Sequence, residues 1–249
     1  GTAQITVNVQ TCNACLDCSN SLSGTITSNP TSGLSYCVNN DIVIQGNVNF
    51  NSSEFKFAPG VKVIVDNNAV LSISRSHLYA CNNFWQGIVI KDNITGGPGT
   101  GRVIITGNSL IEDARIAVDV PNHLTTTLPA GQYIVLINGA ILNKDSIGVR
   151  INQYQPAVSA PYLFSIRNSV FTCRNIPYTV TAPFLSSAGS VGNVKATAAN
   201  LGVPLASPYI DEAVYNTVNT WYGMPSFYGV QLINVGQTQN PTTSSPNYF

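Results

Sequence analysis

Charged side chains are scarce in this chain of 249 residues, and the few that occur cancel one another. Asp, Glu, Lys and Arg together make up 9% of the sequence, and the formal net charge is +0. An average soluble protein has roughly 25% charged residues. Because the chain has no basic excess with which to neutralise a phosphate backbone, we expect no nucleic-acid partner.

Long apolar runs are also missing. No stretch approaches the roughly 18 apolar residues that a bilayer-spanning helix needs, and the first residues lack the basic and apolar regions of a signal peptide. We therefore expect no membrane span. The start at Gly1 is interpreted as that of a processed form or of a fragment of a longer chain.

In place of charge, the sequence is rich in Asn, Thr, Ser and Gln, and a neutral polar coat of this kind suits a protein outside the cell. The six cysteines, an even number, fit an oxidising compartment. The composition therefore predicts a secreted or cell-surface protein.

Four of the cysteines lie close together near the N-terminus: Cys12, Cys15, Cys18 and Cys37. We predict at least one disulfide within this cluster. A zinc cage and free thiols are the alternatives, although the two-residue gaps on both sides of Cys15 crowd a tetrahedral site. Cys81 and Cys173 stand alone, and we expect them to be small buried apolar groups.

A short pattern of small and β-branched residues returns at nearly fixed intervals. It occurs as GIVI, AVDV, GVRI, PYTV and GVQL, starting at residues 87, 117, 148, 177 and 229. The first three steps are about thirty residues each, and the last is longer by about twenty. Alternation of this kind predicts strands, and the long step predicts one insertion.

A second element keeps the same spacing, as VIITGNSLI from Val103, IVLINGAIL from Ile134 and LFSIRNSVF from Leu163. Each has Asn or Gly in its middle, and these residues tolerate the positive φ of a sharp bend. Strands separated by sharp bends and repeated at a fixed period stack as parallel coils. The stretch SLIEDARIAVDV at 109–120 is thus predicted to be a bend and a strand rather than a helix.

The predicted fold is all-β, a right-handed parallel β-helix. The alternative is a β-sandwich, which does not predict that distant segments repeat in register. In the β-helix, Ile88, Val118 and Val149 form one inward column. The small residue that begins each GV strand leaves room for the neighbouring coil.

Three regions follow from this pattern. Residues 1–40 are predicted to be a Cys-rich N-terminal cap, and residues 41–249 the parallel β-helix, with an insertion at 178–226. Within the insertion, Ser207 has the features of an N-cap, and an apolar stripe from Ile210 to Trp221 predicts one short helix that docks on the flank of the coils.

The run LYACNNFWQGIVIKD, followed by GRVIITGNSLIEDARIAV, resembles the β-helical repeat region of large secreted and surface proteins of Bacteroidota. The resemblance covers residues 41–176 and 226–236, and Trp85, Gly87 and Ala114 are its most specific positions. It implies type IX secretion, with export across the outer membrane and attachment or release there. The C-terminal sorting domain that such proteins usually carry is not visible in the sequence.

Candidate catalytic groups are few, because the chain has only 11 acidic residues. The best constellation comprises Asp113, Asp119, Lys144 and Arg150. Aligned repeats place Asp119 beside Arg150 and Asp113 beside Lys144, so each carboxylate has a basic neighbour. This pairing favours ordinary ionisation and a structural ladder over an acid–base pair, and we assign no catalytic residue, metal or cofactor.

Other residues are candidates for binding or modification. Asp119 and Arg150, and the aromatic pair Trp221 and Tyr222 in the insertion, are candidates for contacting a sugar or a partner. Asn51 and Asn93 match the N-glycosylation sequon, and Ser146 lies in a DSI triplet that resembles the O-glycosylation motif of Bacteroidota. His77 and His123 lie in unrelated contexts without a recognisable partner.

The sequence therefore favours a secreted or surface-displayed structural or adhesive solenoid that acts as scaffold, spacer or polymer subunit. Other subunits or a longer parent chain would join at its open ends, and a surface glycan is a further candidate partner. The alternative is a polysaccharide lyase or hydrolase, or a carbohydrate-binding module, that uses the groove beside the GV strands.

Overall fold

The computed structural model describes residues 15–91, 100–107, 109–121, 133–152, 164–167, 169–172 and 228–233. Every element in these ranges is a β-strand, and every pairing between strands is parallel, which confirms the all-β prediction there. Parallel pairing is not that of a β-sandwich, whose sheets are antiparallel. The predicted helix after Ser207 and the insertion at 178–226 lie outside the described residues.

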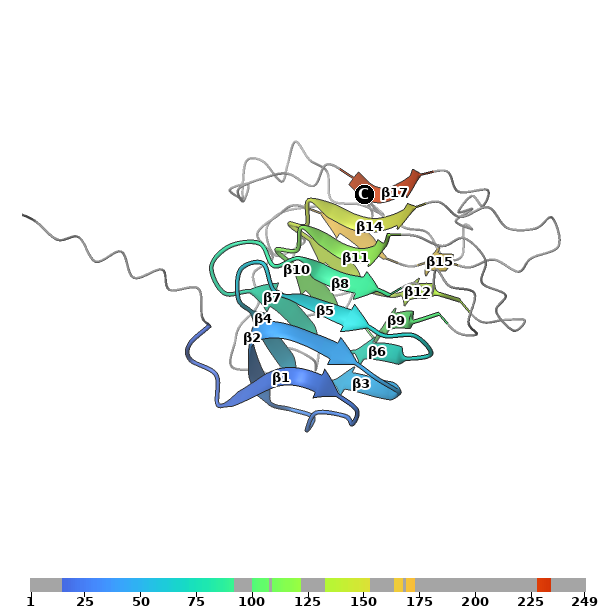
Figure 1. Cartoon of the computed structure of the whole chain (residues 1–249). Coiled ribbons are helices and arrows are strands. Elements are labelled where there is room, and N and C mark those ends of the chain that lie inside the picture. Colours follow the sequence, from blue (N-terminus) through green and yellow to red (C-terminus); the bar gives the residue numbers. More distant parts are fainter. Residues whose placement is uncertain are drawn as a thin grey trace, which may run out of the picture.

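Beyond the first two strands, each strand pairs with the strand three places further along the chain, which produces three parallel ladders (Figure 1). The first ladder contains β3 (Asn47–Asn51), β6 (Val70–Ser74), β9 (Arg102–Thr106), β12 (Val135–Asn138) and β15 (Phe164–Arg167). The second contains β4 (Glu54–Phe57), β7 (His77–Ala80), β10 (Leu110–Glu112), β13 (Ile141–Asn143) and β16 (Val170–Thr172). The third contains β5 (Lys62–Val65), β8 (Gly87–Ile90), β11 (Ile116–Val120), β14 (Ile147–Asn152) and β17 (Tyr228–Ile233).

The first two strands, β1 (Asn20–Ile26) and β2 (Ser35–Ile44), join the second and third ladders into one sheet. The first half of β2 pairs with β4 and the second half with β5. Strand pairing therefore begins at Asn20, and the boundary predicted after residue 40 falls inside β2. The alternation is hidden in the sequence because exposed polar residues, 39–41, separate the buried Val38 from the buried Ile42.

The hydrophobic core lies between the ladders, where alternate residues of stacked strands form columns. Val118 is the register partner of both Ile88 and Val149, and all three side chains are 0% exposed. The predicted inward column is confirmed. Because burial of such a side chain contributes roughly 1.5–3 kcal/mol, each repeat is stabilised mainly by its neighbours in the stack.

The third ladder differs from the predicted order near its end. β14 pairs directly with β17, so that Val149 faces Val230. The prediction that PYTV follows GVRI in this column is therefore wrong. A Cβ on Gly148 would lie 2.5 Å from the carbonyl oxygen of Gly229, so this close approach requires a glycine at position 148. PYTV lies outside the described residues.

Two disulfides fasten the N-terminal segment to the strands, joining Cys18 to Cys37 and Cys15 to Cys81. The first confirms the predicted disulfide within the cysteine cluster. The expectation that Cys81 is an isolated apolar group is wrong, because stacking brings it to a cysteine 66 residues away. Cys12 and Cys173 lie outside the described residues.

A column of buried serines links successive repeats at the bend between the first and second ladders. The N–H of Ser53 donates to Ser76 Oγ (3.3 Å), and the N–H of Ser76 donates to Ser109 Oγ (3.3 Å). Each hydroxyl in turn donates to a backbone carbonyl, as Ser76 Oγ does to that of Phe50 (3.0 Å). These hydroxyl groups thus accept hydrogen bonds from buried backbone N–H groups at the bend.

We expect Ser76→Ala to lower the free energy of unfolding by about 1–3 kcal/mol, because it removes the hydroxyl that accepts from the buried N–H of Ser53. The control is Ser72→Ala on the outward, half-buried face of β6, which should leave stability nearly unchanged. Urea denaturation measures both. Equal midpoints for the two variants would show that the serine column does not stabilise the fold.

Gly87, at the start of β8, confirms the expected need for a small residue there. Its φ is +102°, and a Cβ would overlap the carbonyl oxygen of Ile116 in the next strand of the ladder. An L-residue is therefore disfavoured both by backbone conformation and by space.

Gly87→Ala should be more destabilising than Gly46→Ala. Gly46 also has a positive φ (+75°), but a Cβ there meets nothing within 4 Å, so its substitution carries only the backbone strain of about 1–2 kcal/mol. At Gly87 the displaced strand adds roughly another 1–3 kcal/mol. Thermal unfolding of both variants gives the comparison, and an equal loss at the two sites would exclude the steric role.

Candidate functional site

Polar and charged side chains gather on the outward face of the second ladder. Leu78, Ile111 and Leu142 belong to the core and point inward, so that the residues beside them in the strands point away from it. Among these, His77, Glu112 and Asn143 are nevertheless at most 2% exposed. A buried group of this kind is stable only if its members are paired.

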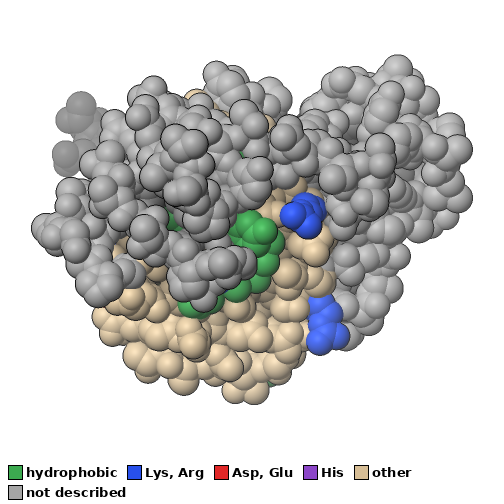
Figure 2. Space-filling view, turned by 90° about the vertical axis from the view of Figure 1, so that its right-hand side faces the viewer, with side chains coloured by type: hydrophobic (Ala, Val, Ile, Leu, Met, Phe, Trp, Pro, Cys, Tyr) green, Lys and Arg blue, Asp and Glu red, His purple; other side chains and the backbone are tan. Residues whose placement is uncertain are grey.

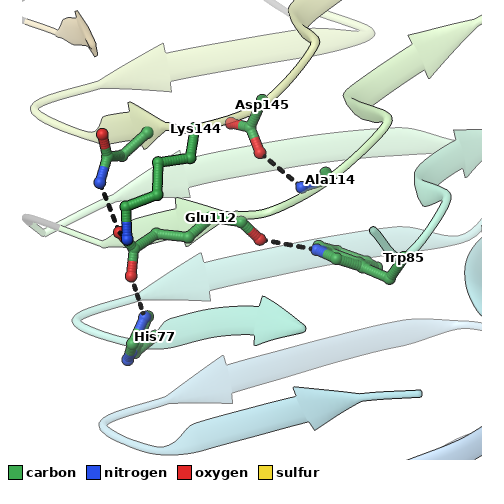
Figure 3. A network of polar contacts seen from close by, with 7 residues as sticks. His77, Trp85, Glu112, Ala114, Lys144 and Asp145 are labelled. Atoms are coloured by element: carbon green, nitrogen blue, oxygen red, sulfur yellow. Dashed lines mark hydrogen bonds and ion pairs between the residues drawn. The ribbon is translucent and has the colours of Figure 1, made fainter. Parts of the chain in front are cut away.

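Glu112 is the centre of this polar cluster (Figure 3). Its Oε2 lies 2.9 Å from His77 Nε2, and its Oε1 accepts a hydrogen bond from Asn143 Nδ2. Lys144 Nζ lies 3.3 Å from the same Oε1. The carboxylate thus contacts side chains from the repeats before and after its own, which offsets the desolvation of its charge.

Trp85 attaches the cluster to the core. Its indole Nε1 donates to the backbone carbonyl of Glu112 (2.8 Å), and its ring is fully buried and stacked on Phe57 with centroids 4.1 Å apart. Trp85 also forms an isolated parallel bridge with Ala114. Buried tryptophan needs a partner for its N–H, and here the partner is the backbone of the strand that carries Glu112.

Asp145 lies in the bend after β13 and is 1% exposed. Its Oδ1 accepts the N–H of Ala114 (2.8 Å), and its Oδ2 has no hydrogen-bond partner among the described residues. Burial raises the pKa of Asp145 well above its usual value, and the negative charges of Asp113 and Glu112 raise it further. The neutral acid is therefore favoured.

The pKa of the Asp113 carboxyl group differs from the ordinary value that the sequence predicts. Burial raises its pKa to about 6, and the charge of Glu112 adds to this, while Lys144, His77 and the N–H of Ala80 act in the opposite direction. The prediction that a basic neighbour keeps Asp113 ordinarily ionised is therefore wrong. Lys144 forms an ion pair with Glu112, a carboxylate that the sequence did not single out.

Asp113→Asn should stabilise the protein at neutral pH. A raised pKa in the folded state means that Asp113 contributes stability below its unfolded value of 3.8, and that this contribution is lost as the pH rises through about 6. Asn keeps the left-handed backbone (φ 58°) accessible. The gain at about pH 8 should be on the order of 1–3 kcal/mol and should vanish towards pH 4.

Denaturant unfolding at several pH values measures this difference. The control is Asp41→Asn, since Asp41 is an exposed carboxylate paired with Lys62 on the surface, and its substitution should produce no such gain at high pH. A D113N variant with the wild-type pH profile would contradict the raised pKa of Asp113.

Asp119 and Arg150 lie side by side, as predicted. They are register partners on the third ladder, and Arg150 Nε and Nη2 donate to the two carboxylate oxygens of Asp119 at 2.9 and 2.7 Å. The hydrogen bonds raise the pKa of Arg150. Because each group satisfies the other, the pair has the character of a ladder contact between strands.

The other candidate residues are distributed differently. Asn51 ends β3, where its side chain donates to Ser32 Oγ (3.3 Å). Ser146 is half-buried, and its N–H donates to the carbonyl of Ala114 (3.0 Å). Outside the described residues lie Asn93, His123, Trp221 and Tyr222.

Sequence reasoning missed the association of His77 with Glu112. The signal was present, because VLSISRSHL at 70–78 has the same pattern as VIITGNSLI at 103–111. Aligning the two stretches places His77 beside Leu110, as the structure does. Glu112 follows Leu110 by two residues, so it lies close to His77. The register shifts by one residue along this stretch, since Ser74 pairs with Thr106 but His77 pairs with Leu110, and this shift hides the match in the sequence.

The cluster has limited chemical scope. The described residues bring no three His, Cys, Asp or Glu side chains into a metal-binding arrangement, and they contain no helix with the length and hydropathy of a membrane span. Burial raises the pKa of Asp113 to about 6, whereas Glu112 is enclosed by its partners. The arrangement mainly connects three successive repeats.

Comparison with protein-family models, with curated proteins and with solved structures finds no match to this chain.

Proposed function

We propose that this protein is a right-handed parallel β-helix that serves as an extracellular scaffold or spacer. The observation that carries the proposal is the in-register stacking of each strand on the strand three places away, with a continuous apolar core along the stack. Such a stack resists bending, since each repeat is hydrogen-bonded to the next along three ladders. The resemblance to β-helical repeat regions of type IX secretion substrates in Bacteroidota is part of this proposal.

An extracellular setting is supported by the cysteines and by the surface. The two disulfides are compatible with an oxidising compartment. Figure 2 views the molecule from the side where Figure 1 places β6, β9 and β12, and the described part of this face is mostly uncharged, with a small apolar area and two basic side chains. A surface with so few charges suits adhesion to a glycan or protein better than to a polyanion.

A second candidate is a polysaccharide-active enzyme or a carbohydrate-binding module. It is favoured by Asp113, whose pKa of about 6 is near the range that general acid catalysis requires. It is weakened by the pairing of Glu112 and Asp119 with basic side chains, because glycoside hydrolysis needs two carboxyl groups that are both available to substrate.

Proteolysis and activity assays on the full chain distinguish the two functions. For a scaffold, we expect the stacked strands to resist trypsin and proteinase K, with disulfide reduction exposing the N-terminal strands first. We also expect no product from a panel of neutral and acidic polysaccharides. If the wild type releases sugars and folded Asp113→Asn does not, the protein is an enzyme and the scaffold proposal is wrong.

A further inference from the structure

Two strands at opposite ends of the stack, β1 and β17, differ from most of the strands between them. Among the described residues, β1 pairs only with β2, and β17 pairs only with β14. Figure 1 shows β1 at the bottom of the stack and β17 at the top. Because every pairing is parallel, both strands run in the same direction, and their unpaired edges face opposite ways along the stack.

The core columns are incompletely covered at these ends. Three apolar side chains of the end strands are only partly buried: Leu22, Ile26 and Val230. Their register partners are 0% exposed: Val38, Ile44 and Val149. Stacking a further strand on either end would therefore remove apolar surface from water.

Neither end strand carries the charged residues or prolines that often protect a free edge, and β1 has one register irregularity, between Leu22 and Gly24. β1 (NSLSGTI) and β17 (YGVQLI) contain no Asp, Glu, Lys, Arg or Pro. Of the five strands between them on this path, β2, β5, β11 and β14 each contain one charged residue, and β8 contains none. Natural proteins discourage edge-to-edge pairing with charges or proline, so uncharged strands at both ends indicate edges that pair.

We propose that copies of this chain stack head to tail, with β1 of one copy added in parallel to β17 of the next. The inference rests on the proposed function as a structural solenoid. Its register is that of the third ladder continued, whose outward positions run Thr25, Val43, Ile64, Val89, Asp119, Arg150 and Gln231. Thr25 of one copy then lies beside Gln231 of the other, and Val230 lies beside Gly24.

A second copy is the partner that fits both ends. It supplies a parallel, uncharged strand, and strand addition of this kind provides backbone hydrogen bonds along the edge. Two β1 strands meeting head to head would pair antiparallel and leave β17 uncovered. A head-to-tail contact joins two different surfaces, so it continues into a filament.

Sedimentation velocity of the full chain over a range of concentrations tests the proposal with two blocking variants, Ile26→Lys and Val230→Lys. The wild type should form species of growing size, whereas each variant alone should remain monomeric, with self-association weakened by at least about tenfold. An equimolar mixture of the variants should form a dimer and nothing larger, because each retains one competent end. Ser72→Lys, in the middle of the stack, is the control and should assemble as the wild type does.

Cysteine crosslinking covers the case in which a blocking variant does not fold. Thr25→Cys, at an exposed position, and Gln231→Cys, at a half-buried one, should form an intermolecular disulfide when mixed, and Thr25→Cys mixed with Ser72→Cys should not. A wild type that stays monomeric, or V230K that still dimerises, would overturn head-to-tail assembly. If the protein is a monomer that resists protease, the assembly proposal is wrong and the scaffold proposal is retained. If it releases sugars, the scaffold proposal is wrong, and the assembly is decided by the sedimentation and crosslinking results.

Discussion

The parallel hydrogen-bond ladder between strands three places apart is the constraint on which the rest of this structure depends. It determines which residues share a column, so that similar apolar side chains stack in the core, as Ile88, Val118 and Val149 do. It also fixes where side chains must be absent, as at Gly87 and Gly148. A repeat therefore has little stability by itself and obtains it from the repeats on either side.

The same stacking makes a buried charged cluster tolerable. A lone Glu112 at its position would be strongly disfavoured, but the ladder supplies His77 from one side and Asn143 and Lys144 from the other. Burial raises the pKa values of Asp113 and Asp145, and the like charges that stacking brings together add to the rise. The contacts of Glu112 with side chains from the repeats before and after its own hold these repeats in register.

The strands at the ends of the stack differ from those in its middle in how their edges and apolar side chains are covered. Inside the stack, each edge of a strand is paired, and charged residues such as Asp119 and Arg150 find partners across the ladder. At the ends, the columns terminate in partly buried Leu22, Ile26 and Val230, and disulfides reinforce only the N-terminal one within the described residues. This asymmetry between middle and ends is the physical basis of the proposed scaffold and of the proposed assembly of copies.

The sequence by itself determined the strand type, the repeat and the inward column, because a side-chain period of two and a repeat of fixed length are properties of neighbouring residues. It also determined the pairing of Asp119 with Arg150, since both lie in well-aligned strands. Only the tertiary structure decided the disulfide between Cys15 and Cys81, the place of β17 beside β14, and the contact between His77 and Glu112. These depend on loop lengths and on burial, which bring together residues that no local pattern relates and which shift their pKa values through desolvation.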